Sequence, residues 1–151
     1  MNPSTLKTLY LRDLERLLFE MNAYKDEKNM WIINHQVNNS AGNLCLHICG
    51  NLQHFIGAIL GESEYERNRD EEFSMKNIAT EILIQEIEFA KAAIVTGFDA
   101  YNTVLNEETY PIEVFGKPMT YEYFLYHLYG HLNYHLGQIS YHRRLLEPSA
   151  I

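Results

Sequence analysis

Histidine is the residue type in this sequence whose spacing most clearly suggests chemistry. The chain has seven histidines among its 151 residues. The segment YHLYGHLNYHLGQISYH contains His131 and His135, which are four residues apart. In a helix, two side chains at that spacing face the same way about one turn apart, so their imidazoles can bind one ion together. A complete site would need a further ligand from another element.

His47 is the candidate for that third ligand. It lies in the middle of NLCLHICGN, among residues typical of a helix core. A buried imidazole needs partners for both ring nitrogens, and a metal at one nitrogen with a carbonyl or carboxamide at the other meets that need. Asn51 lies four residues further along the same face. We expect Asn51 either to be that partner or to touch a bound ligand.

Three imidazole ligands would leave one or more coordination positions open, as in a catalytic metal centre. Neutral imidazoles suit a divalent Zn, Ni, Fe or Cu ion, and the residues alone do not choose among these metals. Metal-assisted hydrolysis would also need a general base. The sequence offers Glu86 and Glu88 for this role, without a pattern that places them near the histidines.

The other histidines are not expected to be ligands. His54 would lie about 10 Å along the helix axis from the third ligand, and His127 would be rotated about 80° from the far member of the pair. Each is therefore predicted to line a pocket or the surface. His35 and His142 follow no pattern.

Four long amphipathic segments are predicted to be the helices that position these residues. The first begins near Pro3, which suits a first helical turn, and its leucines follow a helical period. The others are predicted at about 41–60, from 75 past Gly97 to 105, and 121–146. Their expected N-caps are Ser40, Ser74 and Thr120. This pattern predicts an all-α protein, a four-helix bundle forming one domain over residues 1–151.

Two connections between the predicted helices differ in character. The segment Glu62–Glu72, with the sequence ESEYERNRDEE, is highly charged and is predicted to be a solvated loop. The segment Tyr110–Met119 combines β-branched and aromatic residues with two prolines and a Gly-Lys pair. It is predicted to form a short extended or hairpin excursion before the last helix.

The composition argues against several classes of partner. Hydrophobic residues make up 46% of the chain, enough for a core. The formal net charge is −8 and no stretch concentrates Lys and Arg, so nucleic-acid binding is not expected. No apolar run reaches about 18 residues, so no membrane span is expected. The N-terminus lacks a signal-peptide pattern, which predicts a cytosolic protein.

The two cysteines, Cys45 and Cys49, lie four residues apart in one predicted helix, where a disulfide would strain the backbone. They are interpreted as free thiols in a reducing compartment. Metal binding by them is an alternative, but no second thiol pair completes a zinc site. We therefore expect them to act as small buried hydrophobic residues.

Taken with these motifs, the sequence resembles the DinB-like superfamily, also called the DinB/YfiT-like metalloenzymes. The resemblance covers nearly the whole chain and rests on NLCLHICGN, ERNRDEEF and HLNYHLGQI. The last piece is the most specific, because a His followed by x-Gly-Gln-Ile ends the metal-binding helix of the family. The match maps the family's ligands onto His47, His131 and His135.

The resemblance implies an up-down-down-up four-helix bundle, commonly dimeric, with a divalent metal near one end. Characterised members include thiol-dependent transferases and isomerases that use bacillithiol, mycothiol or glutathione. The protein is therefore expected to be a metal-dependent enzyme acting on a small molecule, with a low-molecular-weight thiol as cosubstrate. The alternatives are a bundle that binds metal or a small ligand without turnover, and a metal-dependent hydrolase.

A homodimer is also expected, in part from the glycines of two predicted helices. Gly50 and Gly57 share one helix face, and so do Gly130 and Gly137. Small residues allow close helix approach, and aromatic residues, which are abundant here, are enriched at protein interfaces. The alternative is that these glycines serve only packing within the chain.

Overall fold

A computed structural model describes residues 1–34 and 37–147 of the chain, which leaves His35 and Pro148 outside it. Within these residues there are five α-helices and no strand. None of the helices there combines the length and apolar character that a membrane span requires. The elements are α1 (Pro3–Asn22), η1 (Glu27–Trp31), α2 (Ala41–Leu52), η2 (Gln53–Ala58), α3 (Arg69–Ser74), α4 (Thr80–Ala100), η3 (Thr103–Glu107) and α5 (Tyr121–Leu146).

Side-chain caps fix the starts of three of the long helices. Asn2 accepts a hydrogen bond from the backbone of Thr5 at 3.0 Å and caps α1. Ser40 caps α2, and Thr120 caps α5 by accepting from the backbone of Tyr123. Such caps satisfy backbone N–H groups that have no partner within the helix. The predicted caps Ser40 and Thr120 are confirmed, as are the predicted bounds of α5.

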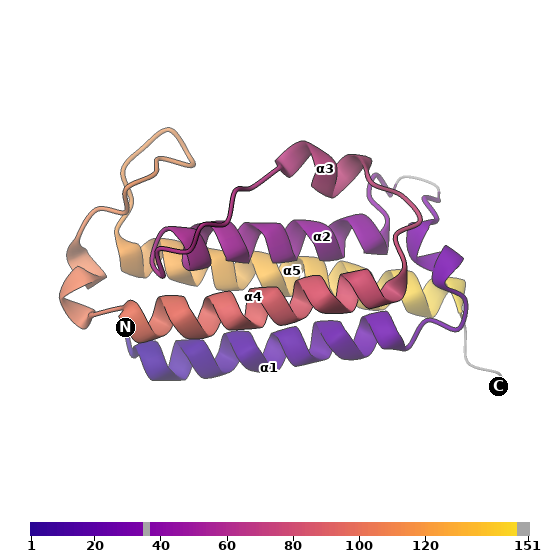
Figure 1. Cartoon of the computed structure of the whole chain (residues 1–151), viewed down its shortest axis with the longest axis horizontal. Coiled ribbons are helices and arrows are strands. Elements are labelled where there is room, and N and C mark those ends of the chain that lie inside the picture. The colour runs from indigo at the N-terminus through magenta and orange to yellow at the C-terminus, as the bar shows by residue number, and fades with distance from the viewer. Residues whose placement is uncertain (35–36, 148–151) are drawn as a thin grey trace.

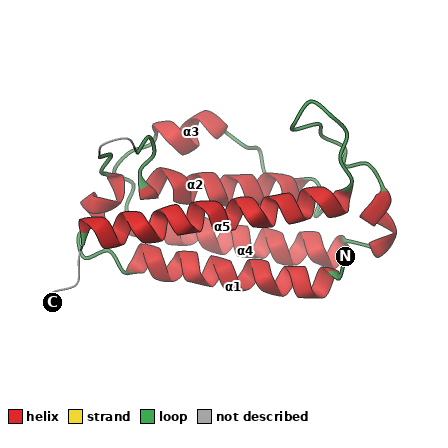
Figure 2. Cartoon of the chain, turned by 180° about the vertical axis from the view of Figure 1, so that it is seen from behind, coloured by secondary structure: helices red, strands yellow, loops and turns green. Residues whose placement is uncertain are grey.

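The four long helices α1, α2, α4 and α5 lie side by side, and α3 lies outside them along α2 (Figures 1 and 2). Helix α4 packs against both α1 and α2, and α5 packs against the same two helices. Because α3 also packs on α2, that helix is covered on several sides, and 11 of its residues are buried. The polar side chains of Asn43, His47 and Asn51 on this helix are therefore buried, so any hydrogen-bond partners they have must come from inside the protein.

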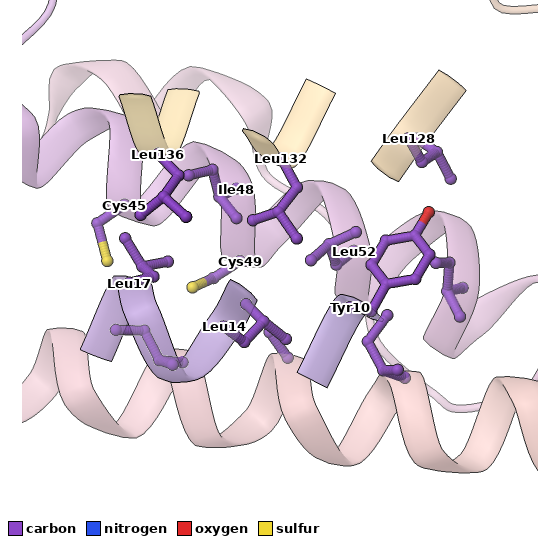
Figure 3. Packing of buried hydrophobic residues seen from close by; sticks show 14 of the residues in the cluster. Tyr10, Leu14, Leu17, Cys45, Ile48, Cys49, Leu52, Leu128, Leu132 and Leu136 are labelled. Atoms are coloured by element: carbon purple, nitrogen blue, oxygen red, sulfur yellow. The ribbon is translucent and has the colours of Figure 1, made fainter. Parts of the chain in front are cut away.

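The core lies between the long helices (Figure 3). Leucines and isoleucines of α1, α2 and α5 meet there, and α4 adds the buried Leu83, Ile87 and Ile94. Cys45 and Cys49 are free and buried, with their sulfur atoms among these leucines. This confirms their interpretation as small core residues.

The charged connection after α2 differs from the prediction. It is not a solvated loop throughout, because its last residues form α3 and Glu72 is buried. Asn68 caps this helix, accepting from the backbone of Glu71. Ser74 ends α3 and does not cap the next helix, which begins only at Thr80 and has no side-chain cap.

The region before α5 corrects one sequence prediction and confirms another. Helix α4 ends at Ala100 rather than near residue 105, since Tyr101 is extended and Asn102 caps η3 instead. The expected hairpin-like excursion over Tyr110–Met119 is confirmed: an isolated antiparallel bridge pairs Thr109 with Thr120 at its base, and the backbone N–H of Tyr110 donates to the carbonyl of Met119 at 2.8 Å. Gly116 has a φ of 67° in this loop, which favours glycine.

The second predicted helix continues past α2 as one π-helical segment, η2, in which Ile59 N–H bonds the carbonyl of His54. A β-carbon on Gly57 would lie 2.9 Å from that of Ala93 on α4. The predicted role of glycine in close helix approach is thus confirmed at this position. By contrast, a β-carbon on Gly130 or Gly137 would meet no described atom within 4 Å beyond its chain neighbours and its own helix backbone, so these two do not serve packing against other described elements.

Candidate metal centre

Helices α2 and α5 bring the three predicted ligand histidines together. The Nε2 atom of His131 lies 3.1 Å from Nε2 of His47 and 3.0 Å from Nε2 of His135. One ring nitrogen from each of the three lies within 4.8 Å of the others. His47 is buried and the other two are half-buried. The cluster therefore has one closed side and one side nearer to solvent.

The geometry of the three nitrogens fits a single divalent ion. Two imidazole nitrogens bound at about 2.0–2.1 Å in tetrahedral geometry lie about 3.4 Å apart, close to the separations found here. Cysteine and carboxylate groups are absent from this set, so the donors are three imidazoles. A site of this kind leaves positions on the ion for water or another ligand.

The outward nitrogens of two ligands have partners that orient the rings. His47 Nδ1 lies 2.7 Å from Oε2 of Glu72, and His135 Nδ1 lies 2.7 Å from Oε1 of Gln138. Both acceptors are oxygens, so each Nδ1 donates its hydrogen and each neutral ring keeps a lone pair on Nε2. Lone pairs that converge in this way favour a cation between them. Carboxylate–histidine pairs of this type are common around metals.

Glu72 is itself held by Arg67. Arg67 donates from Nε to Oε1 at 2.6 Å and from Nη2 to Oε2 at 2.9 Å. The side chains of Arg67 and Glu72 expose only 11% and 6% of their surface. Burial by itself would raise the pKa of Glu72, but the hydrogen bonds from His47 and Arg67 outweigh it and lower that pKa. The carboxylate therefore stays ionised beside His47.

Burial keeps the rings of His131 and His135 neutral. Desolvation, with the neighbouring His135 and His47 as further causes, lowers the pKa of His131 to about 3. Burial also lowers the pKa of His135, although its bond to Gln138 opposes this. Neutral imidazole is the form that binds metal. At neutral pH no proton would have to leave these two rings before an ion could bind.

Asn51 was predicted either to be the partner of His47 or to touch a bound ligand, and the first of these predictions is wrong. The partner of His47 Nδ1 is the carboxylate of Glu72, not a carboxamide. The Oδ1 atom of Asn51 is buried and has no hydrogen-bond partner in the described part of the chain. The other alternative, contact with a bound ligand, stays a prediction.

The two glutamates considered as general bases have partners of their own. Glu86 accepts a hydrogen bond from Gln53 at 2.9 Å, and Glu88 pairs with Lys91. Neither belongs to the three-histidine cluster. The residues that contact the histidines most directly are Glu72 and Gln138.

The remaining described histidines do not join the cluster. His127 packs edge-on against Phe115, with ring centroids 4.7 Å apart, and His54 Nδ1 is buried without a described partner. His142 bridges two segments, with Nδ1 2.7 Å from the hydroxyl of Tyr24 and Nε2 2.9 Å from the carbonyl of Ile32. A structural role accounts for His142.

Arg67, Glu72 and Gln138 are the residues that sequence reasoning missed. Gln138 lies three residues after His135, within reach on a helix, and could have been found from that spacing. The glycine at position 50 indicates that another group packs closely there, because a β-carbon at this position would overlap the carboxylate of Glu72. That signal is readable only when the fold is known.

Fold and site together define an all-helical protein whose cluster of three histidines has the geometry of a metal centre. The chain belongs to the family described as protein of unknown function (DUF1572), which it matches over residues 10–150. No curated protein and no solved structure matches it.

Proposed function

We propose that this protein is a metal-dependent enzyme that joins a low-molecular-weight thiol to a small electrophilic molecule or uses the thiol to isomerise it. The observation that carries the proposal is the convergence of the Nε2 atoms of His47, His131 and His135, with two of the rings oriented from outside by Glu72 and Gln138. Three neutral ligands leave room on the ion for a reactant. Zn or Ni is the proposed metal, with Fe or Cu as alternatives.

The chemistry follows from the donor set. A bound divalent ion lowers the pKa of a coordinated thiol, which then reacts as the thiolate. In transfer, the thiol sulfur forms a bond to an electrophilic carbon, the leaving group departs with its electron pair, and the thiol proton passes to water. The chain's own residues fix the ligand rings, and Asn51 supplies an unpaired buried acceptor one turn from His47.

The wider assignment rests on the resemblance of the sequence to DinB-like proteins. We propose that the four long helices form the up-down-down-up bundle of that superfamily, which is supported by the direction in which the colour runs along them (Figure 1). We also propose a cytosolic homodimer. The buried free thiols of Cys45 and Cys49 fit a reducing compartment, and the open glycines of α5 fit a contact between copies.

A conjugation assay tests the function. Zn- or Ni-reconstituted protein would be incubated with bacillithiol, mycothiol or glutathione and with monobromobimane or 1-chloro-2,4-dinitrobenzene, and thiol consumption would be followed. The expected rate is at least about tenfold above that of His131→Ala, which lacks one ligand. His127→Ala is the matched control, because this exposed ring of the same helix lies outside the cluster.

Each alternative gives a different result. Stoichiometric metal without turnover of any thiol and electrophile pair would favour a binding protein. Turnover of an ester such as 4-nitrophenyl acetate that needs metal but no thiol would favour a hydrolase. Equal thiol consumption by the wild type and His131→Ala would contradict the proposed enzyme.

A further inference from the structure

A large groove lies beside the candidate metal centre. Its volume is about 750 Å³, within the range of small-molecule sites and about twice that of the cavity near the N-terminus, which measures about 370 Å³. The groove runs between the described residues just before α2, such as Asn38 and Asn39, and the last turns of α5, and the start of α2 and the end of α5 lie at the same end of the molecule (Figure 1). Its size suits a molecule larger than a single metal-bound water.

The groove is continuous with the site. His135, one of the three converging histidines, lines it, and so does Gln138, which accepts the hydrogen bond from His135 Nδ1. A molecule lying in the groove would therefore have one end beside the ion position. This continuity favours a reactant of the metal centre as the occupant over a ligand of a separate site.

The groove is lined without formal charge. Among its described lining residues there is no Asp, Glu, Lys or Arg, although the chain as a whole carries a net charge of −8. Tyr134 and Tyr141 expose 65% and 66% of their surface along its wall, and Leu44 adds an apolar contact. Carboxamides of Asn38 and Asn39 supply neutral hydrogen-bonding groups.

From this lining we propose that the groove binds the electrophilic substrate of the metal centre, and that this substrate is an uncharged molecule with an aromatic or aliphatic body. The inference rests on the proposed function. An anionic body would lose its hydration in the groove without gaining a Lys or Arg partner among the described lining residues. A neutral body would stack on the tyrosines and bond the carboxamides.

Two fluorescent probes that differ only in charge test the groove. N-phenyl-1-naphthylamine is neutral, and 1-anilinonaphthalene-8-sulfonate is the same molecule with a sulfonate. The neutral probe is expected to bind at least about tenfold more tightly, both to the wild type and to metal-free His131→Ala. Tyr141→Ala should weaken its binding at least about fivefold. Tyr126→Ala is the matched control, since Tyr126 lies on the same helix, is also exposed and does not line the groove.

A second readout tests the link to the metal centre. Copper bound by the histidines should quench the fluorescence of the neutral probe in the wild type but not in His131→Ala, with copper uptake checked by elemental analysis. If the wild type failed to take up copper, only the proposed function would be contradicted. The comparison of the neutral and anionic probes would still test the groove, because it is made on metal-free protein. Equal affinity for the two probes, equal effects of Tyr141→Ala and Tyr126→Ala, or no quenching by bound copper would overturn the groove proposal. Loss of probe binding at protein concentrations where the chain dimerises would also overturn the groove proposal, because a second copy of the chain would then fill the groove.

Discussion

The carboxylate of Glu72 lies 2.7 Å from Nδ1 of His47, although 25 positions separate the two residues in the chain. This contact joins α3 to α2 and fixes which nitrogen of His47 points toward His131. It gives the six-residue helix α3 a role in the candidate site. The contact also leads to the first prediction.

Glu72→Gln should lower metal affinity by about tenfold to a hundredfold, because the ring keeps an acceptor at Nδ1 but loses the negative charge that makes it a better ligand. A competition titration against a chromophoric chelator measures this. Glu71→Gln, which changes an exposed neighbour, should leave the affinity unchanged. Unchanged affinity in Glu72→Gln would show that this carboxylate does not support the metal. Thermal unfolding of both variants would separate loss of affinity from loss of fold, since Arg67 is left without its partner.

Removal of any one ligand should abolish stoichiometric metal binding. His47→Ala, His131→Ala and His135→Ala each leave only two imidazoles, whereas wild-type protein should hold about one divalent ion per chain. Elemental analysis after reconstitution and desalting measures the content. His142→Ala should retain the full amount of metal, because both nitrogens of that ring bond elsewhere. Equal metal contents in all four variants would mean that the ion binds at another place.

Asn51→Leu should separate stability from function. Its buried Oδ1 has no described partner, so an apolar side chain of similar size should raise the free energy of unfolding by about 1 kcal/mol. Urea titration would measure this. The metal content should stay the same while turnover falls. Asn43→Leu is the control, because that amide bonds the carbonyls of Glu72 and Met75, and its loss should cost about 2 kcal/mol or more. Destabilisation of both variants would mean that Asn51 has a structural partner.

Asp13 should make stability depend on pH. Its burial would raise the pKa, but hydrogen bonds from Arg12 and Tyr129 outweigh this and lower the pKa to about 2, from an ordinary 3.8. The stabilisation is therefore full above about pH 4 and is lost as the pH falls through 2. Asp13→Asn should lower the free energy of unfolding by about 2 kcal/mol at pH 7, and the difference should shrink toward pH 2. Urea titrations across this range measure it, and a difference independent of pH would refute the ion pairing.

The proposed dimer predicts a mass twice the 17.7 kDa of one chain in light scattering coupled to size exclusion. Gly130 has open space where its β-carbon would be, and the exposed Tyr123 and Tyr126 lie on the same helix. Gly130→Glu should therefore give a monomer, because a charge would be buried in the contact. Phe19→Glu, at an exposed position of α1, should not change the mass. A mass of one chain at all concentrations of the wild type would refute the dimer.

The parts of the fold that the sequence predicted well are those with local signals. Ser40 and Thr120 stand just before long amphipathic segments, and the helix starts follow from their hydrogen bonds to nearby backbone groups. His131 and His135 could be paired because a helix fixes their relative positions. Each of these signals acts over a few residues.

The parts that the sequence missed depend on tertiary contacts. Glu72 lies in a run of charged residues that reads as a solvated loop, and only the packing of α3 on α2 buries it. Ser74 resembles an N-cap, but the extended conformation of Met75 ends α3 there and moves the next helix start to Thr80. A helix of six residues shows no periodicity from which it could be recognised.

The helices contribute unequally to the described site, and this determines which surfaces of the protein can accept substitutions. All the polar groups assigned to it come from α2, α3, α5 and the segment that leads into α3, and none of them comes from α1 or α4. Residues on the solvent-facing surfaces of α1 and α4 should therefore vary more during evolution, and sequence similarity to relatives should be higher in the other helices. In engineering, the same two surfaces are the places to attach a tag, a dye or a solid support while leaving the metal ligands untouched.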